Sequence, residues 1–228
     1  MEVYEKSEYR NKQALFEYRS AAGSELGEFL APKYAQSDEA MVLAIPAGGV
    51  PVGLELKRRL EVPFDVCIVR KIQNPWNRES GFGAVNLDGE VLLNEPMKRA
   101  MGVTEKVERE EIERVKEELQ ERNRFFRGDR EAADVRGRTV ILTDDGLASG
   151  YTMMAAAMSV GRRGAARVVA AVPTAPRDAV EMLEKHVDEV YSLHIQYGRG
   201  PFAVARAYRN WRDLSREEVA EMLEHPGE

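Results

Sequence analysis

The chain has 228 residues, of which 43% are hydrophobic and 32% are charged, and its formal net charge is −6. A chain of this length buries a sizeable core as one domain without disulfide bonds. The acidic balance excludes the basic surface that marks nucleic-acid-binding proteins and proteins of anionic membranes. We therefore expect no nucleic acid and no membrane as partners, and an anionic substrate has to be held by a local site.

The N-terminal region has no stretch that resembles a signal peptide. The single cysteine, Cys67, lies in an apolar run that is typical of a core strand. The uncharged run from Ala40 to Leu54 has 15 residues and two prolines, so it is too short and too broken to span a bilayer. A cytoplasmic location is expected.

The first 70 residues alternate between helix and strand patterns. An amphipathic helix is predicted within residues 16–34, ending near Pro32, and a second helix over residues 50–60. Two apolar runs, MVLAIP at 41–46 and FDVCIVR at 64–70, predict strands that are buried on both faces.

The middle of the chain is more polar. Residues 71–83 predict a long irregular connection, and Asp88-Gly89 predicts a hairpin turn between two short strands. A long charged helix is predicted over residues 104–127, where Glu118 and Arg122 lie four residues apart and can pair.

The last 90 residues return to alternating strands and helices. The predicted elements are a strand at 138–145, a helix at 151–163, a strand at 166–173, a helix opened by Pro176, a strand at 188–195 and a last helix capped by Ser215. Strands without polar alternation, separated by helices, are typical of a parallel sheet covered on both sides. The predicted fold class is α/β, doubly wound, with a mainly parallel sheet and helices on both faces.

Three unusual loops follow predicted strands: Ala47-Gly48-Gly49, Arg70-Lys71, and the stretch from Asp144 to Thr152. Ligands of such sheets bind beyond the carboxyl ends of the strands, so these loops are expected to meet. An acidic pair at a strand end can also cap a helix or face solvent. The combination with a small-residue turn and a helix start favours a ligand site.

The third loop suits a ligand with hydroxyls at one end and a phosphate at the other. Gly146 and Gly150 let main-chain N–H groups turn inward, and the following helix start favours an anion. Asp144 and Asp145 are acceptors suited to a vicinal diol. Ribose 5-phosphate fits this layout. No Walker phosphate loop and no dinucleotide fingerprint occurs in the chain.

The stretch VILTDDGLASGYT (140–152) resembles the phosphoribosyl-pyrophosphate (PRPP) motif of the type I phosphoribosyltransferases. The segments AIPAGGVPVG, VRKIQNPWNRESGFGAV, VLLNE, RVVAAVPTAP and GPFAVARAY are similar to those of a little-characterised group of predicted phosphoribosyltransferases in bacteria and archaea. The resemblance covers residues 14–222. It implies a single domain over residues 1–228 with a small hood.

The resemblance also implies roles for residues. Asp144 and Asp145 would hold the ribose hydroxyls, and Arg70 and Lys71 would neutralise pyrophosphate together with Mg²⁺ that arrives with PRPP, near the two aspartates. The 5′-phosphate loop would consist of Gly146, Leu147, Ala148, Ser149, Gly150, Tyr151 and Thr152. The pyrophosphate loop would consist of Ala47, Gly48 and Gly49. Tyr151 replaces a usual small residue, so its ring is expected to point away from the phosphate.

A lid over residues 71–94, with Asn77 and Glu79, would close over the site. Residues 196–211 would form the hood, with Phe202 against the acceptor, followed by a helix over 215–224. Dimers are common among similar proteins, so a homodimer is a possible assembly.

The function implied is a Mg²⁺-dependent glycosyltransferase of nucleotide metabolism. It would transfer the 5-phosphoribosyl group of PRPP to a nitrogen acceptor, such as a nucleobase, with release of pyrophosphate. Ala47 stands where the related group usually carries an arginine, which keeps a non-catalytic PRPP-binding regulator as the alternative. Acids that are salt-bridged inside the core would contradict both interpretations.

Overall fold

The main body is built on a six-stranded parallel sheet. The computed structural model describes residues 1–10, 12–198 and 200–225, and the backbone alone for residues 77–80. The strand order is β1 (Glu2–Glu5), β9 (Glu189–Gln196), β8 (Arg167–Pro176), β7 (Thr139–Thr143), β2 (Ala40–Ala44) and β3 (Phe64–Val66). Every neighbouring pair is parallel, which confirms the predicted sheet.

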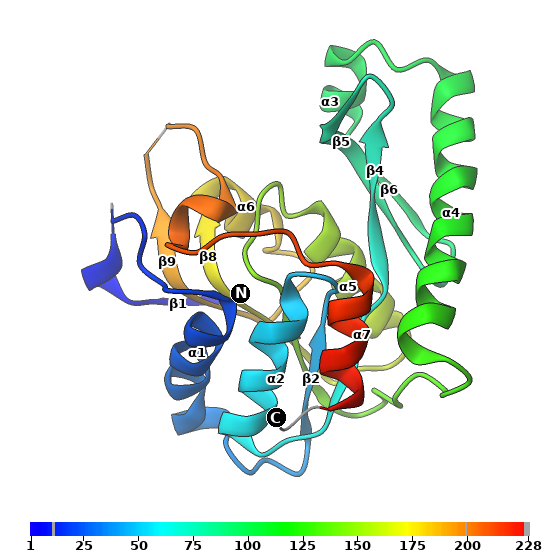
Figure 1. The fold of residues 1–228 in the computed structure, drawn as a ribbon. Coiled ribbons are helices and arrows are strands. Elements are labelled where there is room, and N and C mark those ends of the chain that lie inside the picture. The colour runs from blue at the N-terminus through cyan, green and yellow to red at the C-terminus, as the bar shows by residue number, and fades with distance from the viewer. Residues whose placement is uncertain (11, 199, 226–228) are drawn as a thin grey trace.

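Helices cover both faces of this sheet (Figure 1). One core contains side chains of α1 (Arg19–Tyr34) and α2 (Gly49–Leu60), with Val42 and Ile141 among the strand residues. The other core contains side chains of α5 (Tyr151–Arg162) and α6 (Arg177–Met182), with Leu43 and Leu142 among the strand residues. Successive strand residues face opposite cores, so the uninterrupted apolar runs are explained by burial on both sides. The doubly wound fold is confirmed.

A second, antiparallel sheet projects from the main body as an arm (Figure 1). It consists of β4 (Val69–Asn74), β5 (Asn77–Asn86) and β6 (Val91–Leu93), in that order. Two helices accompany it, α3 (Glu95–Ala100) and α4 (Glu105–Arg127). Thr104 caps α4 through its side chain, as the predicted start of this helix requires.

Two predictions for this region are wrong. Residues 64–70 are not one strand, because β3 ends at Val66 and β4 begins at Val69 in the other sheet. Residues 71–83 are not an irregular connection, because β4 and β5 pair across a tight turn. Gly81 and Gly83 are residues of β5 at close contacts. A Cβ on Gly83 would lie 2.3 Å from the carbonyl oxygen of Leu92. The predicted hairpin between β5 and β6 is confirmed.

The C-terminal part returns to the main sheet. After β9, a short 3₁₀ helix spans Val204–Ala207, and Tyr208 pairs with Phe16 in an isolated parallel bridge. The last helix, α7 (Arg216–Glu224), starts at Ser215 with a full capping box, as predicted. In the described part of the chain, every helix is too short or too polar to cross a lipid bilayer.

Candidate functional site

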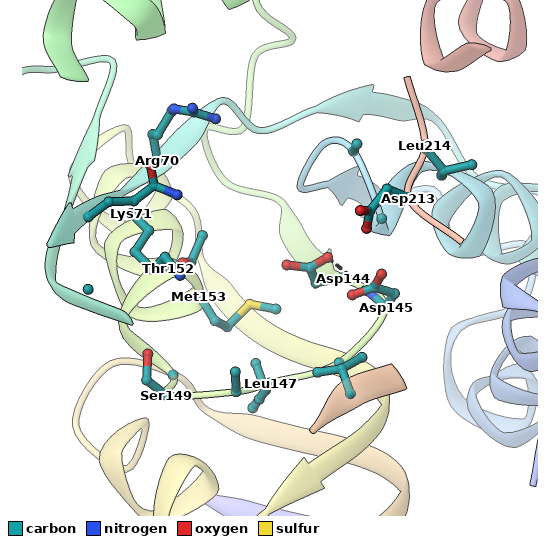
Figure 2. A pocket seen from close by; sticks show the side chains of 18 of the residues that line it. Arg70, Lys71, Asp144, Asp145, Leu147, Ser149, Thr152, Met153, Asp213 and Leu214 are labelled. Atoms are coloured by element: carbon teal, nitrogen blue, oxygen red, sulfur yellow. Dashed lines mark hydrogen bonds between the residues drawn. The ribbon is translucent and has the colours of Figure 1, made fainter. Parts of the chain in front are cut away.

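A cavity of about 870 Å³ lies where the three loops singled out in the sequence come together. Its lining includes Ala47 and Gly48, then Arg70 and Lys71, then the residues from Asp144 to Gly150 together with Thr152. Figure 2 shows the two aspartates on one side of this cavity, with Arg70 and Lys71 on the other. The predicted meeting of the loops is therefore confirmed.

The two aspartates each use one carboxylate oxygen within the protein. Oδ1 of Asp144 accepts a hydrogen bond from the main-chain N–H of Asp145 at 2.8 Å. Oδ2 of Asp145 accepts one from Nε of Arg19 at 2.7 Å. Oδ2 of Asp144 and Oδ1 of Asp145 take no part in these two hydrogen bonds. One oxygen of each acid is left for a ligand.

The ion pair between Arg19 and Asp145 was not predicted. Both residues line the cavity, so the pair lies in its wall and the acids remain at the surface that meets a ligand. The two residues are 126 positions apart in the chain, and no local pattern joins them. The sequence feature that could have indicated this pair is Arg19 itself, a charged residue at the start of the buried face of α1, which is otherwise mostly apolar.

The electrostatics of the acids are unfavourable in the absence of a ligand. Burial, together with the charge of Asp145, raises the pKa of Asp144 well above its usual value. Burial also raises the pKa of Asp145, while the Arg19 guanidinium acts in the opposite direction. A fold that keeps such a pair at a cavity wall sacrifices stability there, which is common at functional sites.

This arrangement predicts that Asp144→Asn stabilises the empty protein. A raised folded-state pKa means that the folded state disfavours the charged form, so the carboxylate weakens folding above that pKa. The melting temperature of the variant should exceed that of the wild type by about 2–4 °C at pH 8, equivalent to about 1 kcal/mol for a chain of this size. The gain should shrink as pH falls below the raised pKa and disappear near pH 3, below the ordinary Asp pKa of about 3.9, where both states are mostly protonated. Thermal unfolding at pH 8, 6 and 3 measures this, and an equal or lower melting temperature at pH 8 would contradict it.

The loop from Gly146 to Thr152 leads into the N-terminus of α5. Gly150 has φ +80°, a conformation that favours glycine, and it is the N-cap residue. No described residue accepts a hydrogen bond from the main-chain N–H groups of Ala148, Ser149 or Gly150. These groups and the helix start form a site with donors available for an anion. Tyr151 does not line this cavity but a neighbouring one, which also contacts Ala148 and Ser149.

The loop at residues 47–49 passes directly against the acids. A Cβ on Gly48 would lie 2.0 Å from Oδ2 of Asp145, so only glycine fits there. A Cβ on Gly49 would lie 2.7 Å from the carbonyl oxygen of Thr143, and Gly49 itself does not line the cavity. Behind the loop, Arg122 of α4 is buried and donates to the carbonyl oxygen of Pro46 at 3.3 Å.

Arg122 brings a positive charge close to Ala47, which stands where the related group usually carries an arginine. Burial, followed by the charges of Arg70 and Arg216, lowers the pKa of Arg122 to about 10, so it remains protonated at neutral pH. Glu118 does not pair with Arg122 as its spacing suggested. It accepts hydrogen bonds from Arg70 at 2.5 Å and from Arg114. The guanidinium of Arg70 is thus held at the cavity wall by α4.

Other residues of interest lie apart from the acids. Phe202 lines an adjoining cavity of about 530 Å³, which shares Ala148 and Ser149 with the first. Val204, not Phe202, packs against the loop that follows Asp145. A Cβ on Gly146 would lie 2.7 Å from Val204 Cγ1. The side chains of Asn77 and Glu79 lie outside the described part of the structure.

No group of three or more His, Cys, Asp or Glu side chains is arranged to hold a metal ion, as far as the described residues go. Burial raises the pKa of the Cys67 thiol to about 12, so this cysteine has no thiolate at neutral pH.

The doubly wound sheet, with an acid pair beside the N-terminus of α5, is the arrangement expected from the resemblance to the phosphoribosyltransferases. The family model of the phosphoribosyl transferase domain matches residues 10–205, and the chain belongs to this family. The family named by the PRPP motif is confirmed.

Two curated relatives from Mycobacterium tuberculosis are named "Putative phosphoribosyl transferase", MT0597 in strain CDC 1551 and Rv0571c in strain H37Rv. Each is 36% identical over 214 residues, which cover 92% of this chain and 46% of the relative. The chain therefore spans about half the length of these relatives. The crystal structure of TT1426 from Thermus thermophilus is similar in fold, with a TM-score of 0.72 and 36% identity over 91% of this chain and 97% of that one.

Proposed function

We propose that this protein transfers the 5-phosphoribosyl group of PRPP to a nitrogen acceptor, such as a nucleobase, and releases pyrophosphate. The observation that carries the proposal is the joint placement of the acid pair and the loop 146–152 in one cavity. This cavity offers carboxylate acceptors at one end and unpaired main-chain donors at the other.

The free oxygens of Asp144 and Asp145 match the 2′- and 3′-hydroxyls of a ribose. A carboxylate that accepts a hydrogen bond from a hydroxyl makes a charge-assisted contact, which is stronger than a neutral one. Because the carboxylates are partly shielded from water, little competing hydration weakens it. The diol would therefore bind the second oxygen of each acid, because the first oxygen already accepts a hydrogen bond within the protein.

The 5′-phosphate would bind the loop 146–152. Its charge is complementary to the N-terminus of α5, and the hydroxyls of Ser149 and Thr152, which line the same cavity, supply further donors.

The pyrophosphate would lie between the loop 47–49 and the side chains of Arg70 and Lys71, with the charge of Arg122 behind the loop. Mg²⁺ fits this site by its donor set, since it prefers oxygen ligands and commonly relies on one or two carboxylates plus substrate phosphates. Asp144 and Asp145 are the carboxylates that would hold it. When bound, Mg²⁺ would neutralise charge on the leaving group.

In the reaction, the bond between C1′ and the pyrophosphate oxygen breaks, a bond from C1′ to the acceptor nitrogen forms, and the proton of that nitrogen passes to solvent. Positive charge develops on the sugar as negative charge develops on the leaving group, so the protein contributes mainly position and charge. Met97 and Met101 of the arm that carries β4 and β5 line the cavity, and this arm would exclude water as the lid. A cytoplasmic enzyme of nucleotide metabolism is the role that follows.

The test is turnover. The protein is incubated with PRPP, Mg²⁺ and a panel of purine and pyrimidine bases, and pyrophosphate release is measured for each base. We expect release above background with at least one base and formation of its nucleoside 5′-monophosphate. Tight PRPP binding without release for any acceptor would identify a non-catalytic PRPP-binding regulator, and no PRPP binding would overturn both functions.

A further inference from the structure

Arg19 makes contacts that reach from the acid pair to the C-terminal segment. It is the first residue of α1, and its side chain is 9% exposed. Its Nε donates to Oδ2 of Asp145 at 2.7 Å, and its Nη1 donates to the carbonyl oxygen of Arg212 at 2.8 Å. One guanidinium thus bonds to both a site carboxylate and a distant stretch of main chain.

The same guanidinium stacks on an aromatic ring of that segment. The carbon at its centre lies 3.9 Å from the ring centroid of Trp211 and 6.0 Å from that of Tyr208. Contacts of this kind are attractive for a guanidinium in a partly desolvated setting. Tyr208 in turn donates its hydroxyl to the main-chain oxygen of Asp145 at 2.6 Å. The segment 208–214 is therefore joined to Asp145 by two separate routes.

This segment also forms part of the cavity wall. Trp211, Asp213 and Leu214 line the cavity with Arg19 itself, and Figure 2 shows Asp213 and Leu214 close to the aspartates. Asp145 and the segment 208–214 therefore border the same cavity and share Arg19 as a contact.

The charges around Asp145 make Arg19 hard to replace. Next to Asp145 lie Asp144 and Tyr208, whose hydroxyl donates to the Asp145 main chain. The other charged residues that line the cavity are Arg70, Lys71 and Asp213. Arg19 is the one cation among the described residues that forms an ion pair with Asp145. Because the guanidinium is planar and held at three points, it fixes which oxygen of Asp145 faces the ligand.

We propose that Arg19 is a positioning residue of this site, which aligns Asp145 for the ribose hydroxyl and couples occupation of the cavity to Trp211. The inference rests on the proposed function. Arg19 acts through Asp145 and does not itself meet the reacting atoms.

The first experiment compares ligands that do and do not carry the ribose. Calorimetry measures the binding of PRPP, of ribose 5-phosphate and of pyrophosphate without Mg²⁺ to the wild type, Arg19→Gln, Arg19→Lys and the control Arg58→Gln, whose ion pair with Glu55 is exposed. In Arg19→Gln we expect PRPP and ribose 5-phosphate to bind at least about 10-fold more weakly, with pyrophosphate binding changed by less than about 2-fold. A merely structural role for Arg19 would weaken all three ligands together.

The second experiment uses Trp211 as the reporter. Trp76, the other tryptophan, is 65% exposed, and Trp76→Phe leaves Trp211 as the sole tryptophan emitter. PRPP should change the Trp211 emission in this background. Arg19→Lys keeps the charge beside Asp145 but has no planar group to stack, so it should recover part of the PRPP affinity and lose the emission change.

The outcomes separate the two proposals. A wild type that binds PRPP, together with an Arg19→Gln variant that binds it equally well, overturns the role of Arg19 and leaves the proposed function intact. An emission change that persists in Arg19→Lys overturns the coupling to Trp211. A wild type that binds neither PRPP nor ribose 5-phosphate overturns the proposed function, and the role of Arg19 with it.

Discussion

The double variant Asp144→Asn, Asp145→Asn should lose measurable PRPP binding while it stays folded. Each substitution removes a charge-assisted hydrogen bond to a hydroxyl, and such bonds contribute about 1.5–3 kcal/mol each. Together they predict a loss of more than about 100-fold in affinity. Asparagine is the suitable replacement, because its carbonyl oxygen still accepts the hydrogen bonds from the Asp145 main chain and from Arg19 Nε.

Calorimetry with PRPP and Mg²⁺ measures the loss, and thermal unfolding confirms that the variant is folded. Pyrophosphate without Mg²⁺ is the matched control ligand, since Arg70, Lys71 and the loop 47–49 are unchanged in the variant. An affinity for PRPP within about 3-fold of the wild type would exclude the acids from the ribose site.

The second large effect is expected from Gly48→Ala. The added Cβ would lie 2.0 Å from Oδ2 and 2.4 Å from Cγ of Asp145, so either the loop or the carboxylate has to move. Displacement of the carboxylate breaks its ion pair with Arg19 and its alignment toward the sugar. We expect PRPP affinity to fall by about 100-fold, with a lower melting temperature.

Gly161→Ala is the matched control for this variant. Gly161 lies within α5, and a Cβ there would meet nothing within 4 Å. Alanine in a helix interior is favoured over glycine by about 0.5–1 kcal/mol, so this variant should bind PRPP normally and melt slightly higher. Equal PRPP affinity in the Gly48 and Gly161 variants would show that the loop 47–49 does not constrain the acids.

Local patterns predicted the main sheet and most of its helices. Each of these elements has a length and a hydrophobic periodicity that can be recognised without knowledge of its neighbours. This holds for the apolar runs of β2, β7, β8 and β9 and for the long charged helix α4. The meeting of three loops at the carboxyl ends followed from the parallel arrangement. The same reasoning placed Asp144 and Asp145 at the site.

The elements that were missed depend on contacts that sequence spacing does not contain. β1 is a short, charged edge strand that becomes regular only by pairing with β9. Residues 71–83 have a polar composition that is typical of a connection, yet they form paired strands, in which Gly81 and Gly83 lie at close contacts with Lys71 and Leu92. The strand pairing, and not the composition, decides the structure.

The ionic contacts of the site were unpredictable for the same reason. Glu118 has a suitably spaced partner on its own helix, but Arg70 from β4 competes for it across the fold, and Arg122 turns to the Pro46 carbonyl instead. Arg19 reaches Asp145 from the other end of the chain. Such pairs are selected by tertiary geometry, whereas exposed pairs four residues apart contribute only a few tenths of a kcal/mol.

The central claim is best tested by a crystal structure of the protein grown with PRPP and Mg²⁺. We predict that the 2′- and 3′-hydroxyls lie within hydrogen-bonding distance of Oδ2 of Asp144 and Oδ1 of Asp145, and that the 5′-phosphate contacts the main-chain N–H groups of residues 148–152. A sugar phosphate bound in a different cavity, or bound here with its hydroxyls turned away from both aspartates, would contradict this claim.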